Sequence, residues 1–350
     1  MAESSDPSAA RSSRRRALSA PWRTLGLDIG GANLKAVHTG GSVVRRAFAL
    51  WRDPAGLAAA LQDLCAALPP ADQIAITMTG ELCDCFENKR DGVAAILDAV
   101  QAVARATPVR VWGNEGRFLD PDAARRMPLQ TAAANWLALA TLVGRFAPSG
   151  PALSIDIGST TTDLVPLLDG KPAPRGRTDP ERLRCGELVY TGARRTPLCA
   201  LINGEVAAEL FATTLDAYLV LGHLPEDAND CNTADGRPAT RPAAETRLAR
   251  MLCADLETST PDERRRLAER AVGRQRALIR DALDAVLRTL ASPPRTLILA
   301  GEGEFLAEQV IGPLPELHGA ERISLSRELG REISAAACAH AVAVLAGEGV

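Results

Sequence analysis

Two short segments, 128 residues apart, place an aspartate, glycines and small polar residues in the same order. Residues 25–35 and residues 153–163 each read as an apolar strand, an Asp-Ile-Gly sequence, a polar turn and a second strand. Glycines let a backbone approach an anion closely, and turn N–H groups form anion-binding concavities. A carboxylate at a strand end is a typical ligand of hydrated Mg²⁺. The pair therefore predicts one cleft for a phosphorylated ligand and a magnesium ion.

The first segment carries the charges that such a ligand needs. Asp28 is the predicted metal ligand, and Gly30 and Gly31 are the predicted phosphate contacts. Asn33 and Lys35 are two residues apart on a strand and share one face, which places Lys35 to neutralise a phosphate as a point charge. Taken alone, the segment also suits an ordinary glycine hairpin with a solvated lysine.

The second segment replaces the lysine with hydroxyl groups and a further carboxylate. Asp156 is the second predicted metal ligand, and Asp163 lies at the position that matches the lysine of the first segment. Serine and threonine hydroxyls can donate to phosphate oxygens. A threonine run is also typical of a plain strand, and the match between the segments favours the functional interpretation. The predicted phosphate contacts in this segment are Gly158, Ser159, Thr160 and Thr161.

Two further groups of charged residues are candidates for the chemistry. Glu81 follows an apolar strand over 73–78 and is placed to deprotonate an alcohol or phenol, a role for which Asp163 competes. Glu81 equally suits a solvated position at a strand end. Arg194 and Arg195 have the fork geometry that binds a diphosphate or a carboxylate, although arginines are also common on surface turns.

Strands that alternate with helices must position these residues, which indicates mostly parallel sheets with sites at the carboxyl ends of strands. The apolar patterns predict strands over 24–29, 33–37, 73–78, 109–112, 163–168 and 296–300. They predict helices over 57–68, 91–106, 131–143, 206–219, 261–291 and 333–346.

A Pro-Ser-Gly-Pro cluster at 148–151 marks the predicted domain boundary. We expect a disordered arm over 1–23, a first domain over 24–150 plus 333–350, and a second domain over 151–332. Residues 225–242 are rich in Asp, Asn, Gly and Pro and form either a mobile lid or a disordered surface excursion. Arg237 is the predicted ligand contact of this loop.

The bulk properties narrow the class of protein. The chain has 350 residues and a formal net charge of −3, which argues against bulk nucleic-acid binding. Neither a secretory signal nor a membrane span is evident, so the eight cysteines are expected as reduced thiols in the cytoplasm. Cys83 and Cys85 lack a second pair at zinc spacing, and the oligomeric state is left open.

Together with Gly301-Glu302-Gly303, the two segments resemble the phosphate and adenosine loops of the actin, Hsp70 and sugar-kinase superfamily. The resemblance implies an α/β fold, the two-domain actin-like ATPase (ribonuclease H-like) fold with an interdomain cleft, and adds Gly301 and Gly303 to the ligand contacts. Other stretches resemble the hydantoinase/oxoprolinase-related branch linked to tetrahydromethanopterin C1 transfer, and within it the synthases of methanofuran and methylofuran biosynthesis. These stretches are residues 77–82, 134–136, 186–197, 235–238 and 301–306.

That branch resemblance implies a Mg²⁺-dependent transferase that joins an aminomethylfuran-methanol diphosphate to a tyramine-type phenol, forming an aryl ether and releasing pyrophosphate. Lys35, Glu81 and Asp163 would be the catalytic residues, and the partners would be small molecules. ATP would bind only under the alternative of a kinase or a hydantoinase-like ATPase. A second alternative is a non-catalytic nucleotide-sensing module. Glu302 departs from the kinase pattern, which has glycine or another small residue at this position. A carboxylate there would repel a nucleotide phosphate, although it could still face the ribose.

Overall fold

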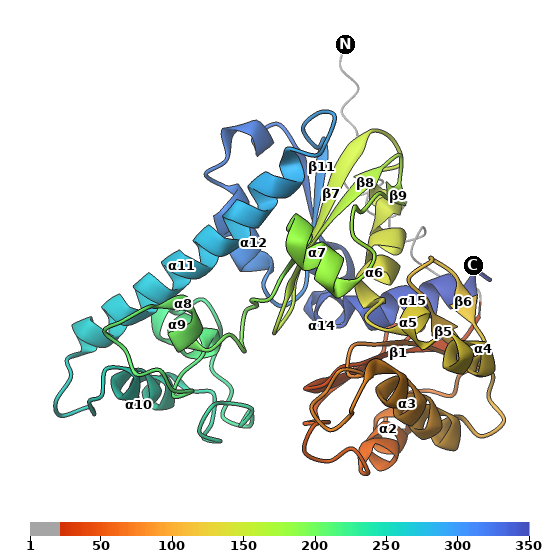
Figure 1. Ribbon diagram of the computed structural model, residues 1–350, viewed down its shortest axis with the longest axis horizontal. Helices are drawn as coiled ribbons and strands as arrows, with labels where there is room; N and C mark the ends of the chain where they lie inside the picture. Colours follow the sequence, from red (N-terminus) through yellow and green to blue (C-terminus); the bar gives the residue numbers. More distant parts are fainter. Residues whose placement is uncertain (1–21, 350) are drawn as a thin grey trace.

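The computed structural model describes residues 22–349, in which two sheets form the framework (Figure 1). The first sheet has the strand order β3-β2-β1-β4-β5-β6, and the second has the order β10-β8-β7-β11-β12, with β9 paired to β8. In each sheet a central strand, β1 or β7, forms an antiparallel hairpin on one side and pairs with a parallel strand on the other. The predicted arm, residues 1–23, lies outside the described residues except for its last two positions.

Short apolar runs between turn residues determine the strands. The first sheet consists of β1 (Thr24–Ile29), β2 (Asn33–His38), β3 (Val43–Ala47), β4 (Gln73–Met78), β5 (Val109–Trp112) and β6 (Phe118–Leu119). The second consists of β7 (Pro151–Ile157), β8 (Thr162–Leu168), β9 (Lys171–Pro172), β10 (Leu188–Val189), β11 (Thr296–Ala300) and β12 (Glu321–Ser324). The predicted central strands match within one residue, whereas the short edge strands carry too little apolar pattern to be predicted from sequence.

Helices cover both sheets and extend beyond the second one (Figure 1). They are α2 (Leu57–Ala66), α3 (Lys89–Ala104), α4 (Pro121–Arg126), α5 (Pro128–Thr131), α6 (Asn135–Val143), α7 (Asp179–Cys185), α8 (Leu198–Leu201), α9 (Thr214–Leu221), α10 (Arg241–Met251), α11 (Pro261–Leu287), α12 (Glu304–Ile311), α13 (Leu325–Leu329), α14 (Arg331–Ala335) and α15 (Ala337–Gly347), with 3₁₀ turns at Gly144–Phe146 and Pro315–Leu317.

The helix predicted over 131–143 is wrong in its first turn. The chain breaks between α5 and α6, where Ala133 has a φ of 49°. A left-handed backbone is costly for a residue with a Cβ, so it occurs where the surrounding structure imposes it. Ala133, Asn135 and Trp136 line the central cavity described below. The break therefore lies at the candidate site.

Two other helices differ from their predictions because of local backbone signals. Helix α9 begins at Thr214 rather than at 206, since Thr213 and Asp216 form a capping box that fixes its first turn. The apolar C-terminal segment forms two helices with a break at Ala336, whose ψ of 30° leaves the helical range. Composition alone does not reveal such breaks.

Helices α6 and α15 pack against each other between the two sheets. Helix α15 covers β1, β2 and β4, while α6 packs on β7, β8 and β9. A Cβ on Gly26 of β1 would lie 2.0 Å from the Ala339 carbonyl oxygen, so glycine is required for this close approach. One apolar cluster contains residues of both helices and both sheets, which fixes the two halves to each other.

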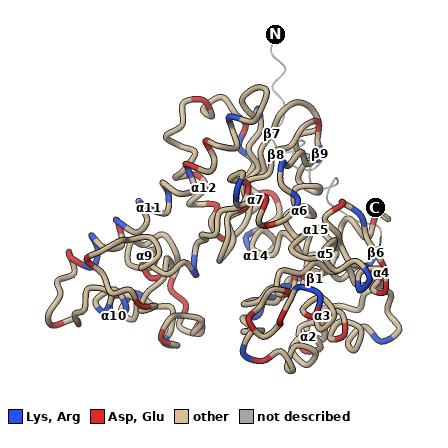
Figure 2. Tube along the Cα trace, viewed as in Figure 1, with Lys and Arg blue, Asp and Glu red and all other residues tan. Residues whose placement is uncertain are grey.

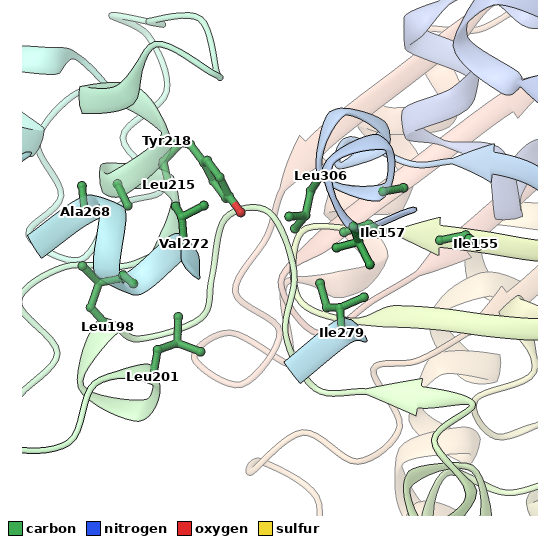
Figure 3. Packing of buried hydrophobic residues seen from close by; sticks show 14 of the residues in the cluster. Ile155, Ile157, Leu198, Leu201, Leu215, Tyr218, Ala268, Val272, Ile279 and Leu306 are labelled. Carbon is green, nitrogen blue, oxygen red and sulfur yellow. The ribbon is translucent and has the colours of Figure 1, made fainter. Parts of the chain in front are cut away.

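A projecting lobe, formed by α8, α9, α10 and the N-terminal half of α11, extends away from the second sheet (Figure 1). Its apolar core includes Leu198, Leu215 and Val272, and the same cluster continues to Ile157 at the end of β7 (Figure 3). Both acidic and basic residues occur along α10 and α11 (Figure 2). The lobe is thus joined to the second hairpin through one continuous core.

Candidate functional site

A central cavity of about 600 Å³ lies between the two halves of the molecule. Both duplicated segments and residues from α3, α6 and α7 line it. Most of the residues predicted from sequence lie on its wall, namely Asp28, Gly30, Gly31, Asn33, Lys35, Glu81, Asp156, Gly158, Ser159, Thr160, Thr161, Asp163 and Arg195. The volume of the cavity is in the usual range of small-molecule sites.

The two hairpin turns have the same backbone geometry. The Gly30 N–H donates to the Asn33 carbonyl at 3.0 Å, and the Gly158 N–H donates to the Thr161 carbonyl at 2.9 Å. Within residues 22–349, the intervening N–H groups of each turn make no hydrogen bond; these are the groups of Gly31, Ala32, Ser159 and Thr160. Unpaired turn N–H groups on a cavity wall form an anion-binding surface.

In the first hairpin, β1–β2, opposite charges face each other. Asp28 and Lys35 are register partners, and their Oδ2 and Nζ atoms are 3.7 Å apart. Burial raises the pKa of Asp28, and the ammonium of Lys35 offsets part of that rise. Burial tends to lower the pKa of Lys35, but Asp28 and other acidic neighbours outweigh it and leave the pKa raised. Lys35 therefore enters the cavity as a cation.

In the second hairpin, β7–β8, the same register brings two acids together. Asp156 is the partner of Asp163. Burial, strengthened by the negative charge of Asp163, raises the pKa of Asp156 to about 7. Asp163 forms an ion pair with Arg182 at 2.9 Å, and the Arg182 guanidinium lies 4.0 Å from the ring centroid of Trp136. Asp163 is thereby fixed by a buried cation, while Asp156 has no ion-pair partner in the described chain.

Glu81 occupies a different part of the cavity wall. Only 1% of the residue is exposed, and its Oε2 atom has no hydrogen-bond partner within the described chain. Burial raises the pKa of Glu81 to about 7, although the ammonium of Lys89, 3.8 Å from Oε1, acts in the opposite direction. A carboxyl group with this pKa exchanges a proton near neutral pH, which is the property of a general base.

One side of the cavity is apolar, and an arginine accompanies it. Leu82, Leu183 and Tyr190 line the cavity although they are among the most exposed large apolar side chains of the described residues. The Arg195 guanidinium lies 5.1 Å from the ring centroid of Trp51, which belongs to the other half of the chain. Four cationic side chains line the cavity, those of Lys35, Lys89, Arg182 and Arg195. Among them, only Arg195 has no ion pair within residues 22–349. This side suits a ring that carries an anionic substituent.

The donor atoms at the two hairpins fit a magnesium ion. Asp28 Oδ1 is buried without a partner in the described chain, and the pKa of Asp156 is raised. The carboxylates of Asp28 and Asp156 are oxygen donors, and a cation would stabilise each of them in the charged form. No group of three or more potential ligand side chains occurs among the described residues. Two carboxylates are nevertheless sufficient, because Mg²⁺ typically takes its other ligands from water and phosphate oxygens.

The predicted contacts Gly301 and Gly303 do not line the cavity. A Cβ on Gly301 would lie 2.3 Å from the Ile157 carbonyl oxygen, and a Cβ on Gly303 would lie 2.4 Å from the Ile157 side chain. The two glycines therefore allow the loop after β11 to pack over the end of β7. Glu302 between them pairs with Arg45 at 3.1 Å and with Arg194 at 3.8 Å.

Arg194 and Arg237 are also absent from the cavity wall. Arg194 pairs with Asp230 in addition to Glu302, so two carboxylates offset its charge. Arg237 is 58% exposed and its nearest acid is Asp235, at 3.9 Å. Their assignment as ligand contacts is not supported by their positions, because neighbouring acids in the tertiary structure bind them instead.

The predicted lid, residues 225–242, is attached to the projecting lobe. Asp235 accepts a hydrogen bond at 2.9 Å from the fully buried Arg247 of α10, which also pairs with Asp216 at 2.6 Å. The Arg241 N–H donates to Glu226 at 2.8 Å. The Arg241 contact closes the loop on itself, and the Asp235 contact holds it to α10, while Asp230 of the same loop pairs with Arg194, next to the cavity residue Arg195.

Several cavity residues were not identified as site residues by the sequence reasoning. Lys89 and Asp179 lie among other charged residues at helix starts, and Cys338 lies in an Ala-rich helix, so no local pattern distinguishes them. Trp136 and Tyr190 belong to stretches that carry the family resemblance, which was the available signal. Cys83, for which the sequence offers no partner pair at zinc spacing, also lines the cavity, and a Cβ on Gly31 would lie 2.5 Å from its sulfur.

Comparison with known proteins gives three results. The hydantoinase/oxoprolinase family model matches residues 72–345. A protein of Methanocaldococcus jannaschii named (4-{4-[2-(gamma-L-glutamylamino)ethyl]phenoxymethyl}furan-2-yl)methanamine synthase is 32% identical over 332 residues, covering 92% of this chain and 96% of the relative. A protein of the same name from Methanococcus vannielii is 33% identical over 200 residues, covering 55% of this chain and 88% of the relative.

Among solved structures, nucleotide-free acetone carboxylase, from a study of ATP-dependent acetone carboxylation, aligns with a TM-score of 0.56 at 14% identity. The alignment covers 91% of this chain and 70% of that one. At this identity the likeness concerns the fold alone, and it agrees with the two sheets of related topology. The predicted actin-like α/β fold is confirmed. No helix within residues 22–349 has the length and apolarity that a bilayer span requires.

Proposed function

The chain belongs to the hydantoinase/oxoprolinase family, and from this premise we propose that it is an enzyme of methanofuran or methylofuran biosynthesis that condenses a furfuryl diphosphate with a tyramine-type phenol. The similarity to the Methanocaldococcus jannaschii synthase extends over nearly the whole of both chains, which supports the role in this pathway. The observation that carries the reaction type is the central cavity, in which two anion-binding turns and Lys35 face the same space as the buried, unpartnered oxygen of Glu81.

The diphosphate donor would bind at the hairpin turns. The N–H groups of Gly31, Ala32, Ser159 and Thr160, which make no hydrogen bond within the described residues, would donate to phosphate oxygens. Lys35 would stabilise the charge that builds on the departing pyrophosphate. Asp28 and Asp156 would hold Mg²⁺, which, when bound, neutralises diphosphate charge and makes pyrophosphate a better leaving group.

The phenol would bind on the apolar side of the cavity, with its hydroxyl group at Glu81. The phenol oxygen forms the new bond to the furfuryl carbon, whose bond to the diphosphate oxygen breaks. The phenol proton passes to Glu81, and the bond electrons leave with pyrophosphate. Glu81 suits the base better than Asp163, because the pKa of Glu81 is about 7 while Asp163 is held by the Arg182 guanidinium.

Incubation of the purified chain with Mg²⁺, aminomethylfuran-methanol diphosphate and either tyramine or glutamyl-tyramine tests the proposal. Mass spectrometry should detect the aryl ether, and a coupled assay should detect one pyrophosphate for each ether formed, without ATP. Omission of the phenol is the matched control and should leave pyrophosphate release at background. Absence of ether with both phenols would overturn the proposal.

The alternative of a kinase or ATPase, and that of a nucleotide-sensing module, require a nucleotide in the cleft. The ion pairs of Glu302 with Arg45 and Arg194 place a carboxylate and its partners at the loop that holds adenosine in the superfamily. The two arginines offset the negative charge of Glu302, so an assay with ATP decides between these alternatives and the condensation. Steady phosphate release from ATP without an acceptor would support the ATPase, and nucleotide-dependent capture of a partner without turnover would support the sensor.

A further inference from the structure

A buried set of polar groups links the projecting lobe to the turn of the second hairpin. Its centre is Gln275 of α11, which is fully buried although it carries an amide. The Tyr218 hydroxyl of α9 donates to Gln275 Oε1 at 2.6 Å. On the other side, Gln275 Nε2 donates to the Gly192 carbonyl at 2.7 Å and to the Thr191 hydroxyl at 2.9 Å. The amide thus has partners on both ends.

The segment that Gln275 holds, residues 191–195, lies directly on the second hairpin turn. The Ala193 N–H donates to the Gly158 carbonyl at 2.9 Å, and the Arg195 N–H donates to the Ser159 carbonyl at 2.9 Å. The Arg194 N–H also donates to the Ser159 carbonyl, at 3.1 Å. Binding these carbonyl groups from behind orients the peptide planes of the turn.

Close packing makes this contact sensitive to position. A Cβ on Gly192 would lie 2.6 Å from the Gly158 carbonyl oxygen and 2.6 Å from the Thr160 nitrogen. The Thr162 hydroxyl donates to the Thr191 carbonyl at 2.8 Å, which fastens the segment to β8 as well. A shift of residues 191–195 therefore moves the turn whose N–H groups face the cavity.

We propose that Gln275 is a positioning residue for the second hairpin turn, and that through it the projecting lobe sets the affinity of the cavity for a diphosphate. The inference depends on the proposed function, because that function places the diphosphate at this turn. Figure 3 shows the Tyr218 hydroxyl pointing from the lobe toward the side where Ile157 and Ile279 lie. Gln275 does not line the cavity and acts only through residues 191–195.

The test compares three variants that perturb the lobe differently. Gln275→Leu removes both hydrogen-bonding ends, and Tyr218→Phe removes only the bond to Oε1. Val272→Ala is the matched control, because Val272 lies on the same helix in the apolar core and has no polar link to the turn. Isothermal titration with Mg²⁺-pyrophosphate gives the Kd of each variant, and thermal melting gives its stability.

We expect Gln275→Leu to raise the pyrophosphate Kd about tenfold or more, and Tyr218→Phe to raise it about threefold. Val272→Ala should lower the Tm while leaving the Kd within twofold. Gln275→Met keeps the length of the side chain but has no N–H donor to Gly192, so it should bind as weakly as the leucine variant. Wild-type affinity in the methionine variant, or equal Kd values in Gln275→Leu and Val272→Ala, would overturn the inference.

The same measurement separates this inference from the proposed function. A wild-type protein that binds pyrophosphate but forms no aryl ether would contradict the condensation, and the Kd series would still test Gln275. If the wild type forms the ether but Gln275→Leu leaves the KM for the diphosphate substrate unchanged, the positioning role is contradicted while the condensation stands. A wild-type protein without affinity for pyrophosphate would overturn both.

Discussion

The two hairpins of this protein share their backbone and differ in their charges. In both, an aspartate on the first strand faces its register partner across the hairpin, and that partner is Lys35 in β1–β2 but Asp163 in β7–β8. The lysine is a cation on the cavity wall, whereas burial, together with the second acid, raises the pKa of Asp156, and that second acid is itself bound by Arg182. A single exchange at equivalent positions thus places a lysine opposite the aspartate in one half and a second carboxylate opposite it in the other.

The loops that follow the parallel strands β4 and β11 also share a backbone contact and differ in the partners of one carboxylate. The N–H groups of Gly80 and Gly303 donate to the equivalent carbonyls of Ile29 and Ile157, and each glycine precedes a glutamate. Glu81 keeps a buried oxygen without a partner in the described chain. Its counterpart Glu304 instead accepts four hydrogen bonds from three serines, namely Ser324, Ser326 and Ser334. One carboxylate is available for chemistry and the other serves structure.

The largest expected effect is the loss of stability on removal of the Asp163 carboxylate from the second hairpin, β7–β8. Asp163→Asn leaves Arg182, whose side chain is 1% exposed, without its carboxylate, and should lower the free energy of unfolding by about 3–5 kcal/mol. Asp28→Asn is the matched change in the first hairpin and should cost less, because the Lys35 side chain is 22% exposed and reaches water. Urea denaturation of both variants measures the difference, and equal losses would contradict the assigned asymmetry.

The next effect concerns the cation of the first hairpin. Lys35→Met keeps the apolar stem but removes the charge, and should lower kcat by about 10²–10³-fold. Lys171→Met, which removes an exposed lysine of β9, is the control and should leave kcat unchanged. Steady-state kinetics with saturating donor and phenol measure both variants. Wild-type turnover in Lys35→Met would remove Lys35 from the chemistry.

Glu81→Gln should lower kcat about 10²-fold and change its pH profile. In the wild type, kcat should rise with pH through an inflection near 7, where the base loses its proton. The inflection should disappear in Glu81→Gln and persist in Glu304→Gln, the equivalent change in the second half. An inflection near 7 that survives in Glu81→Gln would assign it to another group, Asp156 foremost.

The same pKa predicts a pH dependence of stability. The ordinary pKa of 4.5 is raised to about 7 in the folded chain, so the folded state binds more protons between these values. The unfolding free energy contributed by Glu81 therefore falls as pH rises from 4.5 to 7 and is constant above. Glu81→Gln should gain stability relative to the wild type across that window, as urea titrations at pH 5 and pH 8 would show. A pH-independent difference would contradict the buried carboxyl.

The smallest expected effect concerns the loop over 225–242. Arg237→Ala should change KM for either substrate by less than twofold, because its guanidinium is exposed and lies outside the cavity wall. Arg195→Ala is the informative counterpart, since Arg195 lines the cavity without an ion pair in the described chain, and should raise KM about tenfold. Reversed effects of the two changes would restore the lid hypothesis.

Sequence reasoning succeeded where the signal is local. Four central strands match residue for residue, because short apolar runs between turn residues determine them. The duplicated Asp-Ile-Gly segments were sufficient to predict which turns line one cavity, since equivalent strands end at equivalent places in related sheets.

What the sequence did not reveal depends on tertiary contacts. The roles of Gly301 and Gly303 are set by the approach of the loop to Ile157, which no spacing encodes. Lys89 reaches Glu81 only because α3 and the loop after β4 meet at the cavity. The break at Ala133 likewise follows from packing, since an Ala- and Leu-rich run has no local reason to interrupt a helix.

The position of an oxygen label tests the central claim that a phenol displaces pyrophosphate in the cavity between the two hairpins. The phenol, labelled with ¹⁸O at its hydroxyl group, is incubated with Mg²⁺, the furfuryl diphosphate and the protein, and both products are analysed by mass spectrometry. The account predicts that all of the label appears in the aryl ether and none in pyrophosphate, because the furfuryl carbon–oxygen bond breaks. Label in a phosphorus-containing product, with no labelled ether, would contradict it.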